Sequence, residues 1–104
     1  MNDEKRHVKR RPTTLVFEIY DSEGLLMQGT GRLTNLSDTG ALLESAQSLA
    51  PDQALRLRLR LKGHALLEVS VRVVRILHKV QVRTYGVRFE PLSAAQLEQL
   101  RRLS

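Results

Sequence analysis

The chain has 104 residues, of which 41% are hydrophobic, 27% are charged and none is cysteine. This length supports one small hydrophobic core and excludes a second domain, while the lack of cysteine excludes disulfides, thiolate chemistry and cysteine-based metal sites. The 17 lysines and arginines outnumber the 11 aspartates and glutamates and give a net charge of +6. This charge favours an anionic partner such as nucleic acid, a membrane surface, a nucleotide or an acidic protein.

The first 12 residues differ from the rest of the chain in composition. They contain five basic and two acidic side chains, so that +3 of the net charge of +6 lies in this short segment. Because the segment has few apolar residues to bury, we expect residues 1–12 to be a flexible arm that becomes ordered when it binds an anion. Residues 13–104 are then the folded domain.

Six segments between residues 13 and 91 have the pattern of β-strands joined by short turns. The alternation of apolar and polar side chains is most regular in "ALRLRLRLK", where every second residue from Leu55 to Leu61 is an inward-facing leucine. "DSEG" predicts a hairpin turn after the first strand. Six short strands predict an all-β fold, a closed six-stranded antiparallel β-barrel. The strands are expected at residues 13–20, 25–37, 41–45, 54–62, 65–80 and 81–91.

A C-terminal α-helix is predicted after the last strand. Ser93 and Gln96 have the spacing of a capping box, and Leu92 and Leu97 have the spacing of a hydrophobic staple, so the helix begins at Ala94. Leucines then repeat along one face of this segment. Because an isolated helix of this length is marginally stable in water, we expect it to pack across one end or side of the barrel.

The sequence offers no set of residues for catalysis. His7, His64 and His78 lack the spacing of metal ligands, the carboxylates are scattered singly, and no serine stands in a GxSxG motif. We therefore expect no enzymatic activity, no metal site and no cofactor. The chain also lacks a signal-peptide core and any stretch approaching the roughly 20 apolar residues of a membrane span, so the expected location is the cytoplasm.

Basic side chains alternate with leucines at residues 56–62, and a nucleic-acid surface is one interpretation of this strand. Binding of single strands relies on aromatic platforms for base stacking, yet the chain has two Phe, two Tyr and no Trp. Basic groups on one face of a strand are more often solvated, or they protect a strand edge from pairing. The composition therefore favours a solvated surface over nucleic-acid binding.

Two segments carry the candidate ligand site, and the first is "RHVKR" at residues 6–10. An arginine presents a planar fork that binds phosphate oxygens, or the O6 and N7 edge of guanine, through charge-assisted hydrogen bonds. Arg6 and Arg10 would lie on one side of a helical turn, or about 13 Å apart in an extended arm, near the span of a dinucleotide. A disordered basic tail is the alternative interpretation.

The second segment is "NLSDTG" at residues 35–40. Asn35 and Ser37 alternate with Leu36, so both can face outward while Leu36 points into the barrel. Gly40 fits a position with positive φ, or one that a ligand approaches too closely for a Cβ atom. The alternative interpretation is a turn held by its own side-chain hydrogen bonds, without a ligand.

Together and in this order, the two segments resemble the signature of PilZ domains, bacterial receptors for cyclic dimeric GMP (cyclic di-GMP). That signature is RxxxR in an N-terminal arm followed by (D/N)xSxxG at a strand end. "YGVRFEPLSAAQLEQLRRL" also resembles the closing strand and C-terminal helix of this family. The resemblance implies a split six-stranded barrel that binds the dinucleotide on its outside, between the barrel wall and the arm.

The resemblance also implies roles for individual residues. Arg6 and Arg10 would bind phosphates and guanine edges, Asn35 and Ser37 would hydrogen-bond the ligand from the barrel wall, and Gly40 would leave room for it.

The chain departs from the family pattern after the second arginine, where Arg11 and Pro12 stand in place of the more usual apolar residue. Arg11 and Lys5 are therefore further candidate contacts. In this family the residue at the position of Lys5 also influences whether one or two ligands bind.

The sequence thus predicts a non-catalytic cyclic di-GMP receptor whose arm becomes ordered on the ligand and signals to a partner protein. Two alternatives remain. One is an adaptor of the same fold that acts through protein–protein contacts, and the other is a non-specific basic nucleic-acid-binding domain. The presence of both motifs counts against the adaptor, because some members of the family lack them.

Overall fold

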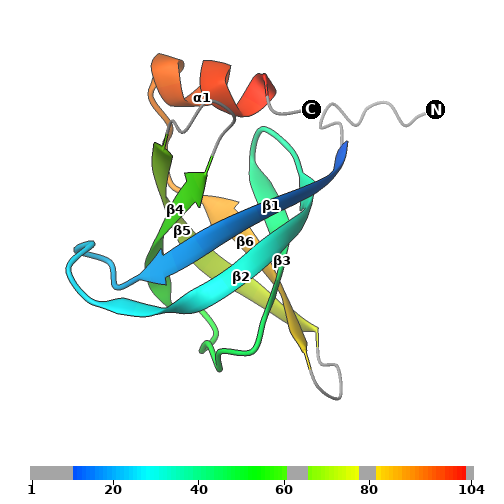
Figure 1. Ribbon diagram of the computed structural model, residues 1–104, viewed down its shortest axis with the longest axis vertical. Coiled ribbons are helices and arrows are strands. Elements are labelled where there is room, and N and C mark those ends of the chain that lie inside the picture. Colours follow the sequence, from blue (N-terminus) through cyan, green and yellow to red (C-terminus); the bar gives the residue numbers. More distant parts are fainter. Residues whose placement is uncertain (1–10, 61–65, 78–81, 103–104) are drawn as a thin grey trace.

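The computed structural model of the chain describes the backbone of residues 11–60, 66–77 and 82–102, and side chains from Leu15 onward within these ranges. Six strands are followed by one helix (Figure 1). The elements are β1 (Arg11–Tyr20), β2 (Met27–Leu36), β3 (Gly40–Ser45), β4 (Ala54–Arg60), β5 (Leu66–Leu77), β6 (Arg83–Phe89) and α1 (Ala94–Arg101).

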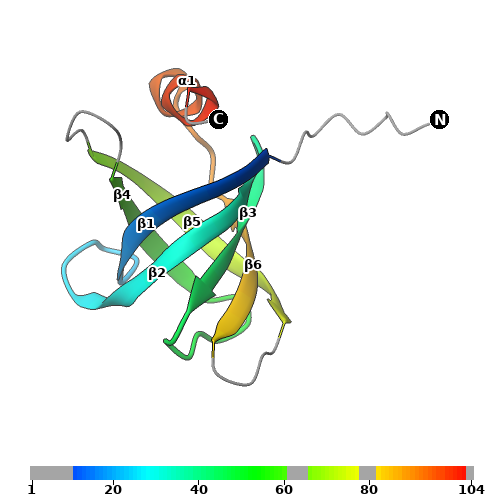
Figure 2. The same cartoon turned by 45° about the vertical axis from the view of Figure 1, so that its right-hand side comes forward.

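The strands form a closed antiparallel barrel in the order β1-β2-β3-β6-β5-β4. Closure results from the pairing of β1 with β4 on one side and with β2 on the other. The predicted six-stranded antiparallel barrel with a C-terminal helix is therefore confirmed. In both views α1 lies across one end of the barrel, the end at which β1 begins and β2 turns into β3 (Figures 1 and 2).

The barrel interior is filled by the apolar side chains that the alternating pattern predicted. Phe17 and Ile19 of β1 and Leu57 and Leu59 of β4 are fully buried, because each lies at the inward position of its strand. Burial of each such side chain stabilises the fold by roughly 1.5–3 kcal/mol. The buried apolar residues form one continuous core, to which α1 contributes Leu100.

The strand pairing contains several irregularities, and two β-bulges matter for the site, one near the end of β2 and one within β5. Leu33 and Leu36 are both buried although they are three residues apart, because Thr34 is an extra residue relative to β3. In β5 the extra residue is Val74, which lies between residues paired with Val87 and Gly86. Val74 and the next residue are therefore both exposed, although they are consecutive.

Several strand boundaries differ from the prediction by one or two residues: β2 ends at Leu36, β3 begins at Gly40 and β6 ends at Phe89, and the starts of β1 and β2 also differ. β1 begins at Arg11 rather than Thr13, so the backbone of the last two residues assigned to the arm pairs with β2. β2 begins at Met27 rather than Leu25, because the carboxylate of Asp21 accepts hydrogen bonds from the backbone N–H groups of Leu25 and Leu26, at 2.8 and 3.4 Å. These bonds hold both leucines in the hairpin turn.

The helix α1 begins as predicted, with a capping box. The Ser93 side chain accepts a hydrogen bond from the backbone N–H of Gln96, and the Gln96 side chain accepts one from the backbone N–H of Ser93. Gln96 also donates from Nε2 to the carbonyl oxygen of Glu68 in β5, at 2.8 Å. Together with buried Leu100, this bond fixes α1 on the barrel end.

Candidate ligand-binding site

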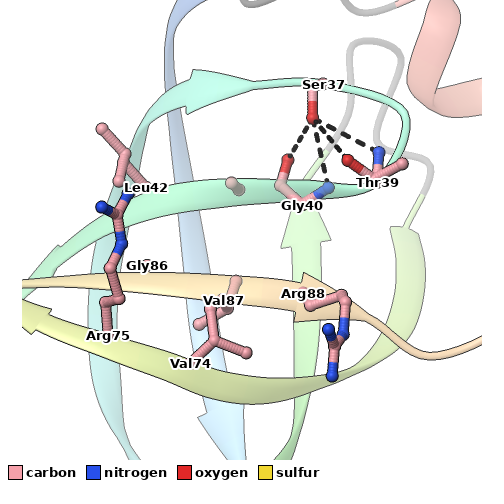
Figure 3. A pocket seen from close by; sticks show the side chains of 10 residues that line it. Ser37, Thr39, Gly40, Leu42, Val74, Arg75, Gly86, Val87 and Arg88 are labelled. Atoms are coloured by element: carbon pink, nitrogen blue, oxygen red, sulfur yellow. Dashed lines mark hydrogen bonds between the residues drawn. The ribbon is translucent and has the colours of Figure 1, made fainter. Parts of the chain in front are cut away.

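The turn between β2 and β3 is organised around the hydroxyl group of Ser37. Its oxygen accepts hydrogen bonds from the backbone N–H groups of Thr39 and Gly40, at 3.3 and 3.2 Å, and donates to the Gly40 carbonyl, at 3.2 Å (Figure 3). Only 4% of Ser37 is exposed. The predicted outward orientation of Ser37 is therefore replaced by burial inside the turn, since the hydroxyl satisfies backbone groups there.

Asn35, two residues earlier, presents a different environment. Its side-chain oxygen Oδ1 is buried and has no hydrogen-bond partner among the residues that the structure describes. A buried acceptor without a partner costs free energy, and this cost falls when a donor group binds to it. Asn35 therefore has unused hydrogen-bonding capacity beside the turn.

Gly40 is required by the approach of two strands. A Cβ atom at this position would lie 2.3 Å from the carbonyl oxygen of Val87 in β6, which is far inside any allowed contact. The positive φ considered from the sequence does not occur at Gly40. The close packing of β3 against β6 is thus sufficient to explain glycine here, whether or not a ligand also approaches it.

The start of β1 lies beside this turn. In the antiparallel register Arg11 is opposite Leu36 and Pro12 is opposite Asn35, so the backbone that follows the arm runs along the candidate wall. The predicted contacts Lys5, Arg6 and Arg10 lie outside the described residues, as does the side chain of Arg11. The structure therefore describes only the barrel-wall residues of the predicted site, Asn35, Ser37 and Gly40, with the start of β1 beside them.

A pocket of about 180 Å³ extends from the turn across the outer faces of β3, β6 and β5. It is smaller than the roughly 300–1,000 Å³ of typical small-molecule sites, so it has room for part of a dinucleotide only. The NxSxxG motif accounts for Ser37 and Gly40, whereas the lining residues from β5 and β6 were not predicted from the sequence. The pocket is lined by Ser37, Thr39, Gly40, Ala41, Leu42, Val74, Arg75, Gly86, Val87 and Arg88.

The sequence "VRVVR" in β5 was the available signal for the contribution of this strand to the pocket, because its two consecutive valines break the alternation. The bulge at Val74 results from this break and turns Arg75 to the outer face, opposite Gly86 of β6. The sequence shows where the alternation fails. It does not show which neighbouring strand lies opposite the bulge, and that pairing is what places Arg75 in the pocket.

An ion pair joins the same turn to the C-terminal helix. Arg101 in the last turn of α1 donates from Nη2 and Nε to Oδ2 of Asp38, at 3.1 and 3.3 Å. Asp38 is the residue after Ser37, so the helix contacts the turn directly. Exposed pairs of this kind contribute up to about 1 kcal/mol, and this one helps fix α1 at the site end of the barrel.

The basic face of β4 lies away from this pocket and is matched by acidic side chains. Arg58 donates from Nε and Nη2 to Glu68, at 2.8 and 2.6 Å, and Arg60 donates to Glu18, at 3.2 Å. The hydrogen bonds with Glu68 raise the pKa of Arg58 further above its ordinary high value. The arginines of this strand are thus engaged in ion pairs on the surface.

The described residues contain no group of three or more side chains arranged to hold a metal ion. In the same part of the chain, no helix combines the length and apolar character needed to cross a membrane.

The family model of the PilZ domain matches residues 4–104, which is nearly the whole chain. The chain belongs to the PilZ domain family. This match includes both the RxxxR and the NxSxxG segments and confirms the resemblance found in the sequence. No curated protein shows significant similarity to this PilZ domain.

Solved structures share the PilZ fold at low sequence identity. The Bacillus subtilis inhibitor of motility MotI/DgrA is 21% identical, with a TM-score of 0.78 over 98% of this chain and 50% of that chain. The Escherichia coli YcgR PilZ domain, solved with c-di-GMP, is 13% identical, with a TM-score of 0.77 over 94% of this chain and 87% of that chain. The PilZ domain of CeSA from a cellulose-synthesizing bacterium is 22% identical, with a TM-score of 0.67 over 91% and 93%. This chain therefore spans half of MotI/DgrA and most of the two isolated PilZ domains.

Proposed function

We propose that this PilZ domain is a non-catalytic receptor for cyclic di-GMP that binds the dinucleotide between its N-terminal arm and the barrel wall. The observation that carries this proposal is the register of β1 and β2, in which Arg11 is opposite Leu36 and Pro12 is opposite Asn35. The residue that directly follows the RxxxR motif is therefore held beside the NxSxxG motif, although the two motifs are about 25 residues apart in sequence. The presence of c-di-GMP in the structure of the YcgR PilZ domain supports the choice of ligand.

Chain connectivity limits how far the arm arginines can be from the wall. Arg10 is bonded to Arg11, and Arg6 lies five residues before Arg11, within about 18 Å of it even in a fully extended chain. Both guanidinium groups can therefore reach a ligand on the wall near Asn35. Lys5 and Arg11 are close enough in sequence to add phosphate contacts.

The free-energy cost of ordering the arm requires its contacts with the ligand to form together. Ordering about eight residues costs on the order of 10 kcal/mol of backbone entropy, whereas each charge-assisted hydrogen bond contributes roughly 1.5–3 kcal/mol. Several such bonds offset the cost only when they form together. In this proposal the ordered arm creates a new surface, and a partner protein recognises that surface.

Isothermal titration calorimetry with cyclic di-GMP tests the proposal. The parent chain should bind, and Arg6→Ala or Arg10→Ala should weaken binding at least about tenfold, because the remaining bonds no longer offset the ordering cost. The thermal melting temperature should change little, since these residues precede the barrel. Lys9→Ala is the matched control, because it removes the same charge from the same arm at a variable position of the RxxxR motif.

A parent chain that fails to bind cyclic di-GMP contradicts the receptor function. Equal affinity in the parent and the two arginine variants contradicts the role of the arm.

A further inference from the structure

Two arginines at the pocket differ from the other arginines whose side chains the structure describes. Among those side chains, Arg75 and Arg88 alone have neither an ion pair nor a side-chain hydrogen bond to another described residue, and Arg83 donates to the carbonyl oxygen of Ala46. Of the three described arginines without a carboxylate partner, two therefore lie at the pocket beside the β2–β3 turn, and only Arg83 lies elsewhere. The remaining arginines pair with carboxylates: Arg32, Arg56, Arg58, Arg60, Arg72, Arg101 and Arg102.

The side chain of Arg75 lies across Gly86. A Cβ atom built on Gly86 would be 3.5 Å from Cβ of Arg75, 3.6 Å from its Nε and 3.9 Å from a methyl carbon of Leu42. Gly86 is buried although it is on the outer face, because these two side chains cover it. Figure 3 shows Arg75 extending from β5 over β6 toward Leu42, with Val74 and Arg88 further along the same pocket.

The pocket contains no aromatic side chain against which a purine could stack. The chain has two Phe, two Tyr and no Trp; Phe17, Tyr85 and Phe89 are buried in the core, and the guanidinium group of Arg58 covers the ring of Tyr20 at 4.4 Å. A guanidinium group is planar and stacks on nucleobases as an aromatic ring does. Arg75 is the planar group that lies along the pocket surface, and Val74 beside it is 46% exposed and offers apolar contact.

We propose that Arg75 is a ligand-binding residue of this PilZ domain and that its guanidinium plane stacks on one guanine of the dinucleotide. This inference rests on the proposed function and adds a base-contacting residue outside both sequence motifs. The pocket volume of about 180 Å³ fits one base, so the rest of the ligand extends toward Asn35 and the arm. Arg88, near Gly40, adds positive charge at the opposite end of the pocket.

Calorimetric titration with cyclic di-GMP of three variants at one position tests this inference. Arg75→Ala should weaken binding roughly tenfold, the change expected from losing one stacking contact. Arg75→Lys should weaken binding to a similar extent, because lysine keeps the positive charge but has no planar group to stack on a base. Arg75→Trp should retain most of the affinity, and the single indole that it introduces into a chain without tryptophan should be quenched when guanine stacks on it.

Arg60→Ala is the matched control, because it removes an arginine from the outer face of β4 and should leave binding unchanged. The Arg75 variants should melt near the parent temperature, since Arg75 is exposed and makes no ion pair among the described residues, and Arg60→Ala removes only an exposed ion pair with Glu18. Full rescue by lysine would overturn stacking in favour of a simple charge contact, and unchanged binding in Arg75→Ala would overturn any contact. Either result, obtained with a parent chain that binds, leaves the receptor function intact, whereas a parent that does not bind refutes the function itself.

Discussion

The three wall residues of the NxSxxG motif have different physical roles. The hydroxyl of Ser37 is occupied by the turn, Gly40 is required by the approach of the Val87 carbonyl, and only Asn35 has a buried acceptor without a described partner. The sequence identified all three positions, because residue type and spacing define the motif. It did not separate structural from binding roles, because these depend on which backbone groups surround each side chain.

This difference predicts opposite responses to substitution. Asn35→Ala should weaken cyclic di-GMP binding about tenfold with little change in melting temperature, because its Oδ1 has no described hydrogen bond to lose. Ser37→Ala should lower the melting temperature, because it leaves two backbone N–H groups without an acceptor. Titration calorimetry and thermal melts measure the two effects. A large loss of stability in Asn35→Ala with unchanged affinity would instead assign Asn35 to the turn alone.

At the scale of elements, the sequence predicted a strand or helix correctly where the residues that determine it all lie within that segment. The regular alternation of β4 and the capping box of Ser93 and Gln96 needed no information from elsewhere in the chain. The bulges at Thr34 and Val74 could not be placed in this way, because an extra residue is defined only against its partner strand. The same limit applies to Arg75, because the bulge at Val74 is what places its side chain in the pocket.

The β1–β2 hairpin predicts a pH-dependent contribution to stability. Backbone hydrogen bonds, led by that from Leu25, hold the pKa of Asp21 below its ordinary value of 3.8. Because the folded-state pKa is lowered, the stabilisation is complete above the unfolded-state pKa and is lost as the pH falls through the folded-state pKa. Asp21→Ala should therefore melt below the parent temperature at neutral pH.

The two melting temperatures should converge in acid, once Asp21 of the parent is protonated. Thermal melts of both proteins across a pH series measure this convergence. A temperature difference that stays constant down to strongly acidic pH would show that the Asp21 carboxylate charge does not stabilise the turn.

At the scale of the whole molecule, net charge alone was a poor guide to the partner. The value of +6 is compatible with nucleic acid, but the described arginines of β4 are paired with Glu18 and Glu68. Sequence composition counts charges without showing which of them neutralise one another in space. Two of the three described arginines without an ion pair, Arg75 and Arg88, lie at the pocket, which favours a compact anion over an extended polyanion.

The salt dependence of binding separates these two kinds of partner. A single-stranded oligonucleotide releases many counterions when it binds a basic protein, so any affinity for it should fall steeply between about 50 and 200 mM salt. Cyclic di-GMP has only two phosphates, and its affinity should fall much less over the same range. Titrations of both ligands at several salt concentrations measure the slopes. Tight binding of the oligonucleotide, with a steep slope and no preference for cyclic di-GMP, would favour the nucleic-acid alternative.

Closure of the barrel by the pairing of β1 with β4 limits how another protein can recognise this domain. Where the strands pair, each has a neighbour on both sides, so a partner cannot extend the sheet there with a strand of its own; β1 pairs with β4 from Phe17 to Tyr20. Along these paired stretches, recognition must instead use side chains on the outer surface or at the barrel ends. Substitutions that disrupt assembly without disturbing the fold should therefore be sought among exposed side chains, and a peptide chosen for its tendency to form β-structure should be a poor competitor.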